Sequence, residues 1–292
     1  MFSFKEGKQY NNLLILIFFL LIALDIFVWH TVISGSAHDA LAIYFLDIGQ
    51  GDSSFINLEG GVQILVDGGP NSRVLERLAE VMKPTDRYID VVMLTHPQAD
   101  HLDGLVEVMN RYQVGVFLYN GDASKIGAYG ELMRTIKEKN IPTVVVDAKD
   151  MITNGDSRMT VWWPPAEFVA KNPNDRSLVI GLKTPALSAL FTGDITSKVE
   201  KLLRGKGLRA QVLKVPHHGS KYSSSMQLLK LVQPKVSVIE SGKNRYGHPT
   251  KETLSRLAAV GSRVFRTDTQ GTIKVEVSAG AINIFAKKEG IK

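Results

Sequence analysis

Groups that can hold a metal ion follow directly on a short apolar run, and this stretch constrains the fold more than any other. The run, residues 91–94, is short enough to be a buried strand, and it stops at Thr95. His96, Asp100 and His101 come within the next six residues. Histidine nitrogen and carboxylate oxygen are common metal ligands. A strand that ends in such a cluster predicts a metal site.

The spacing of these groups leaves room for two ions. His96 and Gln98 stand two residues apart, so in an extended loop their side chains project to the same side. Asp100 and His101 are adjacent, so they should diverge from that pair and could serve a second ion a few ångströms away. Two histidines alone would be a weak signal, because histidines in surfaces or cores are commoner than ligands.

The same pattern recurs after two later apolar runs. Residues 187–191 end at Thr192-Gly193-Asp194, where the glycine allows a close approach of the backbone. Residues 212–215 lead into His217 and His218. Adjacent histidines on a loop point apart, so we expect one of them to bind metal and the other to support it or to act as an acid or base. Either histidine could take either role.

A third strand, residues 236–239, leads into a loop that carries Lys243, Arg245 and His248. Ammonium and guanidinium groups suit phosphate oxygens. Such a set is often only a solvated loop, but its place at a strand end, like the clusters before it, favours a substrate-binding role.

Apolar periodicity and turn residues outline the elements around these loops. The runs at residues 53–58 and 62–66 predict a β-hairpin. A helix from Leu102 to Tyr112 is expected just behind the ligand loop, and residues 114–146 predict a β-α-β unit with parallel strands. Asp67, which closes the hairpin, is either a turn residue or a carboxylate that orients a metal-bound histidine.

Several stretches together resemble the metallo-β-lactamase superfamily. Residues 96–101 resemble its metal-binding signature His-x-[His/Asp]-x-Asp-His. The context is similar to one branch, the soluble C-terminal domain of ComEC-type competence proteins, the channels that import DNA. The other matching stretches are Phe45–Ser53, Leu65–Gly69, Leu190–Ile195, Val215–Ser220 and Asn244–Pro249. The resemblance covers roughly residues 40–284.

This resemblance implies an α+β fold, the four-layer αββα sandwich, preceded here by an N-terminal apolar helix. It implies that Asp194 bridges two metal ions and that Asn174 lies near them, although Asn174 also suits a simple turn. The site residues expected on these grounds are the metal ligands His96, Gln98, Asp100, His101, Asp194 and His217, the catalytic groups Asp100, His218 and His248, and the substrate contacts Asn174, Lys243 and Arg245.

The ligand types limit the choice of metal. The chain has no cysteine, so thiolate sites and disulfides are excluded, and nitrogen and oxygen ligands predict Zn²⁺ or Mn²⁺, with one or two ions per chain. Gln98 departs from the signature, because a neutral amide is a poorer ligand than histidine or aspartate. The ion at that position is therefore expected to be weakly held, replaced by another metal or absent.

The N-terminal segment, residues 1–37, is expected to stand apart from a hydrolase domain at residues 38–292. Lys5 and Lys8 precede an apolar run, and the segment from Leu13 to Ile33 would span about 31 Å as a helix, enough to cross a membrane. The lysines favour an anchor with the catalytic domain outside the cell membrane. A cleaved signal peptide ending at residues 35–37 is the alternative, and the protein would then be secreted.

The charge balance and one aromatic pair bear on partners. The chain carries 35 Lys and Arg against 29 Asp and Glu, a net charge of +6. This excess suits nucleic acid or an acidic membrane surface, or it reflects a merely soluble basic surface. Trp162 and Trp163 could line a groove that stacks bases, although aromatic residues before a turn more often belong to the core.

Three functions compete on these grounds. We expect an exported metal-dependent phosphodiesterase, a nuclease that acts on DNA through a metal-activated water, beside or apart from the DNA-uptake machinery. Hydrolysis of an ester, thioester or lactam by the same water is the second, since fold does not determine substrate. A DNA-binding module whose metal site has decayed at Gln98 is the third, although the other ligands are retained.

Overall fold

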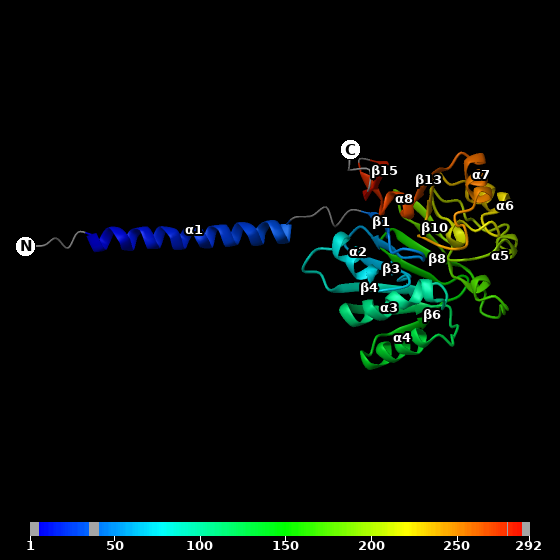
Figure 1. Cartoon of the computed structure of the whole chain (residues 1–292), viewed down its shortest axis with the longest axis horizontal. Coiled ribbons are helices and arrows are strands. Elements are labelled where there is room, and N and C mark those ends of the chain that lie inside the picture. The colour runs from blue at the N-terminus through cyan, green and yellow to red at the C-terminus, as the bar shows by residue number, and fades with distance from the viewer. Residues whose placement is uncertain (1–5, 35–40, 279, 288–292) are drawn as a thin grey trace, which may run out of the picture. The chain divides into compact units, whose positions relative to one another are not determined.

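The computed structural model describes residues 6–34, 41–278 and 280–287, with side chains in the first helix described for residues 13–29 (Figure 1). The chain divides into two units, Met1–His38 and Asp39–Lys292. The first contains helix α1 (Glu6–Ser34), whose side chains from residue 13 to 29 are exposed. Within the described residues, no helix combines the length and the hydropathy that a membrane span needs. The expected cleavage sequence, residues 35–37, lies outside the described residues.

Within the described residues, the second unit contains two sheets. The larger has eight strands in the order β15-β14-β1-β2-β3-β4-β5-β6. Its strands are β1 (Ala42–Phe45), β2 (Ser54–Asn57), β3 (Gln63–Val66), β4 (Tyr88–Leu94), β5 (Gln113–Tyr119), β6 (Thr143–Val145), β14 (Ile273–Ser278) and β15 (Ala281–Ala286). Strands β3 to β6 are parallel, and the others pair antiparallel. The predicted hairpin, β2–β3, is confirmed, and so is the predicted β-α-β unit, in which helix α4 (Gly127–Glu138) joins β5 to β6.

The smaller sheet has seven strands among the described residues, in the order β13-β12-β11-β10-β9-β8-β7. They are β7 (Met151–Asn154), β8 (Ser157–Trp163), β9 (Val179–Lys183), β10 (Ser188–Phe191), β11 (Val212–Lys214), β12 (Val236–Ile239) and β13 (Arg263–Arg266). Strands β10 to β13 are parallel. Their carboxyl ends therefore meet at one edge of the sheet, which is where the chain places its polar loops.

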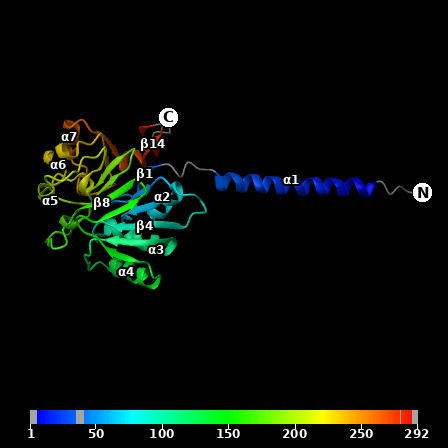
Figure 2. The same ribbon diagram turned by 180° about the vertical axis from the view of Figure 1, so that it is seen from behind.

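The two sheets pack face to face, and helices cover their outer faces (Figure 2). Alternation sends Ala189 and Phe191 of β10 into the core between the sheets and Leu190 into the outer layer. Helices α2 (Arg73–Val81), α3 (Ala99–Arg111) and α4 (Gly127–Glu138) cover the larger sheet, and α5 (Ser197–Leu202), α6 (Met226–Val232) and α7 (Lys251–Ala259) cover the smaller. The predicted four-layer αββα sandwich is confirmed.

The start of helix α3 differs from the predicted one. Helix α3 begins at Ala99, three residues earlier than expected, so Asp100 and His101 lie on its first turn and not on a loop. Gln98 is its extended N-cap residue, and an aspartate in the first turn faces the positive end of the helix dipole. The other helices in the described part of this unit are one-turn helices: η1 (Pro173–Arg176), η2 (Pro216–Gly219) and α8 (Thr267–Gln270).

Candidate metal centre

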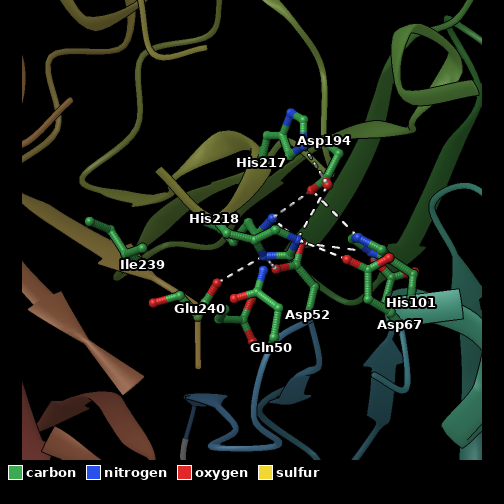
Figure 3. A network of polar contacts seen from close by, with 12 residues as sticks. Gln50, Asp52, Asp67, His101, Asp194, His217, His218, Ile239 and Glu240 are labelled. Carbon is green, nitrogen blue, oxygen red and sulfur yellow. Dashed lines mark hydrogen bonds and ion pairs between the residues drawn. The ribbon is translucent and has the colours of Figure 1, made fainter. Parts of the chain in front are cut away.

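Four side chains from three segments of the chain meet at the edge where the parallel strands end, and Figure 3 shows three of them, His101, Asp194 and His218. Asp194 lies with Oδ1 3.5 Å from His101 Nε2 and with Oδ2 3.3 Å from His218 Nε2. Asp100 Oδ2 lies 3.2 Å from the same His218 nitrogen. One ligand atom from each of the four falls within 4.8 Å of all the others. We call Asp100, His101, Asp194 and His218 the metal cluster.

Asp67 orients His101 within this cluster. It follows β3, and its carboxylate accepts from Thr95 N and Thr95 Oγ1, both at 2.7 Å. Its Oδ2 also lies 2.8 Å from His101 Nδ1. Because that nitrogen faces a carboxylate, it takes the donor role, and the Nε2 atom is left to face Asp194. Of the two roles considered for Asp67, its contacts are those of a carboxylate that orients a ligand.

The structure separates the two adjacent histidines. Both have left-handed backbone conformations, with φ near 51°, so the chain turns sharply through η2. His218 is buried, and its Nδ1 lies 2.9 Å from the Glu240 carbonyl oxygen, which directs Nε2 into the metal cluster. His217 Nε2 lies 3.7 Å from Asp194 Oδ2 at the rim. The metal cluster therefore includes His218, and His217 lies beside it.

Three buried ionisable groups lie around the metal cluster and were not expected as site residues. Lys214 pairs with Asp52 and lies 3.8 Å from Asp194 Oδ1. Glu240 accepts from Ser53 N at 3.0 Å and from Ser54 Oγ at 3.1 Å. Two signals could have revealed them. Lys214 is a charge inside an apolar run, and Glu240 directly follows one, as the other clusters do.

Buried carboxylates and the two histidines set the protonation of the metal cluster. Burial lowers the pKa of His101 and His218, but Asp194 and the other carboxylates outweigh it and hold both pKa values well above the usual range. Burial acts in the opposite direction on Asp194, whose pKa is nevertheless held well below its usual value by His218 and His101. Without a metal ion, the centre therefore pairs imidazolium groups with a carboxylate.

The predicted ligands His96 and Gln98 lie beside the metal cluster and offer one imidazole where the metal cluster offers two. Gln98 Nε2 donates to Asn174 Oδ1 at 2.5 Å, so the two amides are tied to each other. His96 is fully buried, and its ring lies 4.2 Å from that of His101. Burial and the neighbouring His101 lower the pKa of His96 to about 3. This position thus combines one neutral imidazole with two neutral amides.

The cationic loop lies at the rim. Asn244 shapes it by accepting from the backbone nitrogens of Tyr246 and His248, both at 3.0 Å. The His248 ring is 5.6 Å from that of His217, and burial followed by His217 and His218 lowers the pKa of His248 to about 4. Lys243 and Arg245 are exposed on the same loop.

The buried atoms at this edge fit a divalent cation. His96 Nε2, His101 Nε2 and Asp194 Oδ1 are buried without a hydrogen-bond partner among the described residues. Unpaired buried polar atoms are costly and point to a missing ion or water. Imidazole nitrogen and carboxylate oxygen are the ligands that Zn²⁺ and Mn²⁺ accept.

An αββα sandwich that delivers histidines and aspartates to one edge defines a class of metal-dependent hydrolases. The chain belongs to the metallo-β-lactamase superfamily, since the model of that family matches residues 46–242. This confirms the resemblance drawn from the sequence motifs.

Curated relatives include competence proteins. The chain is 29% identical over 249 residues to ComE operon protein 3 of Bacillus subtilis, covering 78% of this chain and 32% of the relative. It is 30% identical over 236 residues to recombination protein 2 of Haemophilus influenzae, covering 79% of this chain and 28% of that protein. A third match, 36% identical over 122 residues, is competence protein ComA of Neisseria gonorrhoeae, covering 40% and 18%. The matched part is thus about a third or less of each of these relatives.

Solved structures share the fold at low sequence identity. The metallo-β-lactamase fold protein YhfI from Bacillus subtilis aligns with a TM-score of 0.55 at 10% identity, covering 80% of this chain and 99% of that one. The metallo hydrolase Igni18 from Ignicoccus hospitalis aligns with a TM-score of 0.54 at 16% identity, covering 81% and 100%.

Proposed function

We propose that the chain is a phosphodiesterase that cleaves DNA, with the metal cluster as its reaction centre. The observation that carries this proposal is the convergence of Asp100, His101, Asp194 and His218 beneath a loop with two exposed cations, Lys243 and Arg245. Cations at that rim suit the phosphates on either side of a scissile bond. Similarity to proteins named for competence and recombination supports DNA as the substrate.

One ion is expected to bind firmly and a second weakly. The metal cluster offers two imidazoles and two carboxylates, whereas His96 shares its side with the Gln98–Asn174 amide pair. Zn²⁺ or Mn²⁺ in the metal cluster would act as a Lewis acid on a phosphoryl oxygen and lower the pKa of a water.

The remaining groups prepare the site for that chemistry. Asp67 and the Glu240 carbonyl hold the two cluster histidines in orientation. His217 and His248 lie at the rim, and both have lowered pKa values, chiefly because of burial. A neutral ring can accept a proton from the attacking water and, once protonated, pass that proton to the leaving oxygen.

The amide pair gives specific support to a second candidate, a DNA-binding module with a degenerate site. Gln98 and Asn174 satisfy each other and leave only His96 at their position. This argues for the loss of one metal position. The four residues of the metal cluster are nevertheless all present, which favours an active site. We therefore rank hydrolysis first.

We also propose that the exposed apolar side chains of α1 serve as a membrane anchor or export signal. The catalytic unit would then act on the outer side of the cell membrane or as a secreted enzyme, in contact with DNA-uptake machinery or independently of it.

To test this proposal, protein loaded with Mn²⁺ or Zn²⁺ is incubated separately with labelled DNA, with bis-nitrophenyl phosphate and with nitrocefin. We expect turnover of the two phosphodiesters and at least about a hundredfold loss in Asp194→Asn, which removes a cluster charge. Lys243→Ala with Arg245→Ala should raise KM for DNA more than for the small diester, because only DNA offers flanking phosphates. Arg134→Ala with Lys137→Ala on α4 is the charge-matched control. Turnover of nitrocefin alone would overturn the proposal.

A further inference from the structure

A groove crosses the outer face of the smaller sheet, at the end opposite the metal centre. It has a volume of about 760 Å³ and includes residues of β8, β9 and β10 and of the segments that lead into β11 and β12. Met159 and Val161 of β8 point into the core between the sheets, so Arg158 and Thr160 point outward by alternation. The pairing of β8 with β9 is irregular between Val161 and Trp163, and Trp162 is placed on the outer face by its contacts there. The metal ligand Asp194 follows the far end of β10.

The lining of the groove is cationic. Arg158, Lys183, Arg209 and Lys235 all line it and are all exposed, and no carboxylate of the described residues lines it. Among the described residues, none of the four has an ion-pair partner. A second hollow that shares Gln211 and Lys235 continues the surface to Arg263. The surface therefore presents a continuous band of unpaired positive charge.

Two of these cations are placed where a sheet tolerates them poorly. Arg158 and Lys183 are direct cross-strand partners in the antiparallel β8–β9 pair, so their side chains share a face. Like charges opposite each other destabilise a sheet. This arrangement lowers the stability of the free protein, and an anionic ligand would remove the repulsion.

Trp162 supplies an aromatic surface beside the cations. A side chain at Gly181 would meet the Trp162 indole nitrogen at 2.6 Å, so the ring lies directly over the bare backbone of β9. Its neighbour Trp163 is instead 4% exposed, and its indole nitrogen donates to the Asp175 carbonyl oxygen at 2.7 Å. Both rings therefore pack in the outer hydrophobic layer, but Trp163 is enclosed there, whereas Trp162 is half-buried and also lines the groove.

We propose that this groove binds single-stranded nucleic acid, with phosphates on Arg158 and Lys183 and a base stacked on Trp162. A cationic groove beside an aromatic platform is the arrangement that non-specific single-strand binding uses. A membrane surface fits less well, because interfacial binding uses exposed apolar side chains and not a concave cationic floor. The inference goes beyond the proposed hydrolysis and does not require the metal centre to be active.

The experiment measures binding of a fluorescein-labelled oligothymidylate to the full chain in nonionic detergent with EDTA, so that no cleavage occurs. For Arg158→Ala with Lys183→Ala, we expect the slope of log affinity against log salt to fall by about 1.4, since each lost phosphate contact on a single strand contributes about 0.7. Trp162→Leu should weaken binding about 5- to 150-fold without changing the slope, because it removes stacking and no charge.

Controls separate this groove from general charge and from the catalytic site. Arg134→Ala with Lys137→Ala removes one arginine and one lysine from α4 and should leave the slope nearly unchanged. The groove variant should melt no lower than the original chain, because it relieves repulsion, and should hydrolyse bis-nitrophenyl phosphate as before if the catalytic proposal holds. Equal losses in both double variants, or groove-dependent binding to phosphatidylserine vesicles without binding to the oligonucleotide, would overturn the inference.

Discussion

At the scale of a single residue, we expect Gln98 to limit how many ions the centre holds. Its amide donates to Asn174 and cannot match the affinity of an imidazole. In Gln98→His, the new ring stands two residues from His96, and we expect tightly bound metal to rise from about one ion per chain to about two. Metal analysis after dialysis measures this.

Gln113→His is the matched control, because Gln113 is exposed at the start of β5 and a histidine there should leave the metal content unchanged. Metal content that stays the same in Gln98→His would show that the amide is not what limits the second position.

Glu240 makes the stability of the metal-free protein depend on pH. Burial, followed by the charge on Asp52, raises the pKa of Glu240 from 4.5 to about 8. Between these values the folded state holds a proton that the unfolded state has released, so the contribution is complete below about pH 4.5 and is lost as pH rises through about 8. The slope is at most about 1.4 kcal/mol per pH unit.

In Glu240→Gln this titration is absent, so the free energy of unfolding should fall less steeply with pH across that window. Urea unfolding at a series of pH values measures the difference. A difference between the two proteins that does not vary with pH would show that Glu240 is ionised in the folded state throughout.

At the scale of elements, the placement of α3 depends on a glycine, Gly104, that lets the helix pack closely against the loop after β3. A side chain at Gly104 would lie 2.0 Å from the Gly68 carbonyl oxygen and 2.8 Å from that of Asn71, and both are backbone atoms that cannot rotate away. Gly104→Ala should therefore push α3 off the loop after β3 and lengthen the 2.8 Å contact between His101 and Asp67.

We expect Gly104→Ala to cost about 1–3 kcal/mol of stability, as overpacking does, and to weaken metal binding at the same time. Gly130→Ala on α4 is the control, because a side chain there meets nothing within 4 Å and alanine favours a helix by up to about 1 kcal/mol. Urea unfolding and metal titration measure both effects. Unchanged metal affinity in a destabilised Gly104→Ala would separate α3 packing from the site.

At the scale of the whole catalytic unit, the metal cluster joins the two sheets. His101 follows β4 of the larger sheet, and Asp194 and His218 follow β10 and β11 of the smaller. An ion shared by these residues would tie the sheets together only in the folded state. Removing it with EDTA should lower the free energy of unfolding by about 2.7 kcal/mol if the free metal had been at a hundred times its Kd.

Thermal unfolding with and without chelator measures that loss. Asp194→Asn should show little response to chelator, because it lacks one cluster charge. An equal metal-dependent shift in the variant would place the ion elsewhere.

The sequence by itself determined most of the elements and the residue types that stand at the strand ends, because both depend on neighbours along the chain. The apolar run before His96, the hairpin of β2 and β3 and the short strand before Asp194 are local patterns, and the family motifs extended them to the αββα sandwich. The start of α3 was predicted wrongly, since Gln98 acts as an extended N-cap and carries no capping hydrogen bond that the sequence could signal.

Only the tertiary structure decided which side chains contact one another. Gln98 meets Asn174 across 76 positions, Ser53 meets Glu240 across 187, and Lys214 meets Asp52 across 162. No local pattern encodes such long-range contacts, because they depend on how the two sheets pack against each other. The same holds for the choice between His217 and His218 and between Trp162 and Trp163, where adjacent residues of one type differ only in the surroundings that the fold gives them.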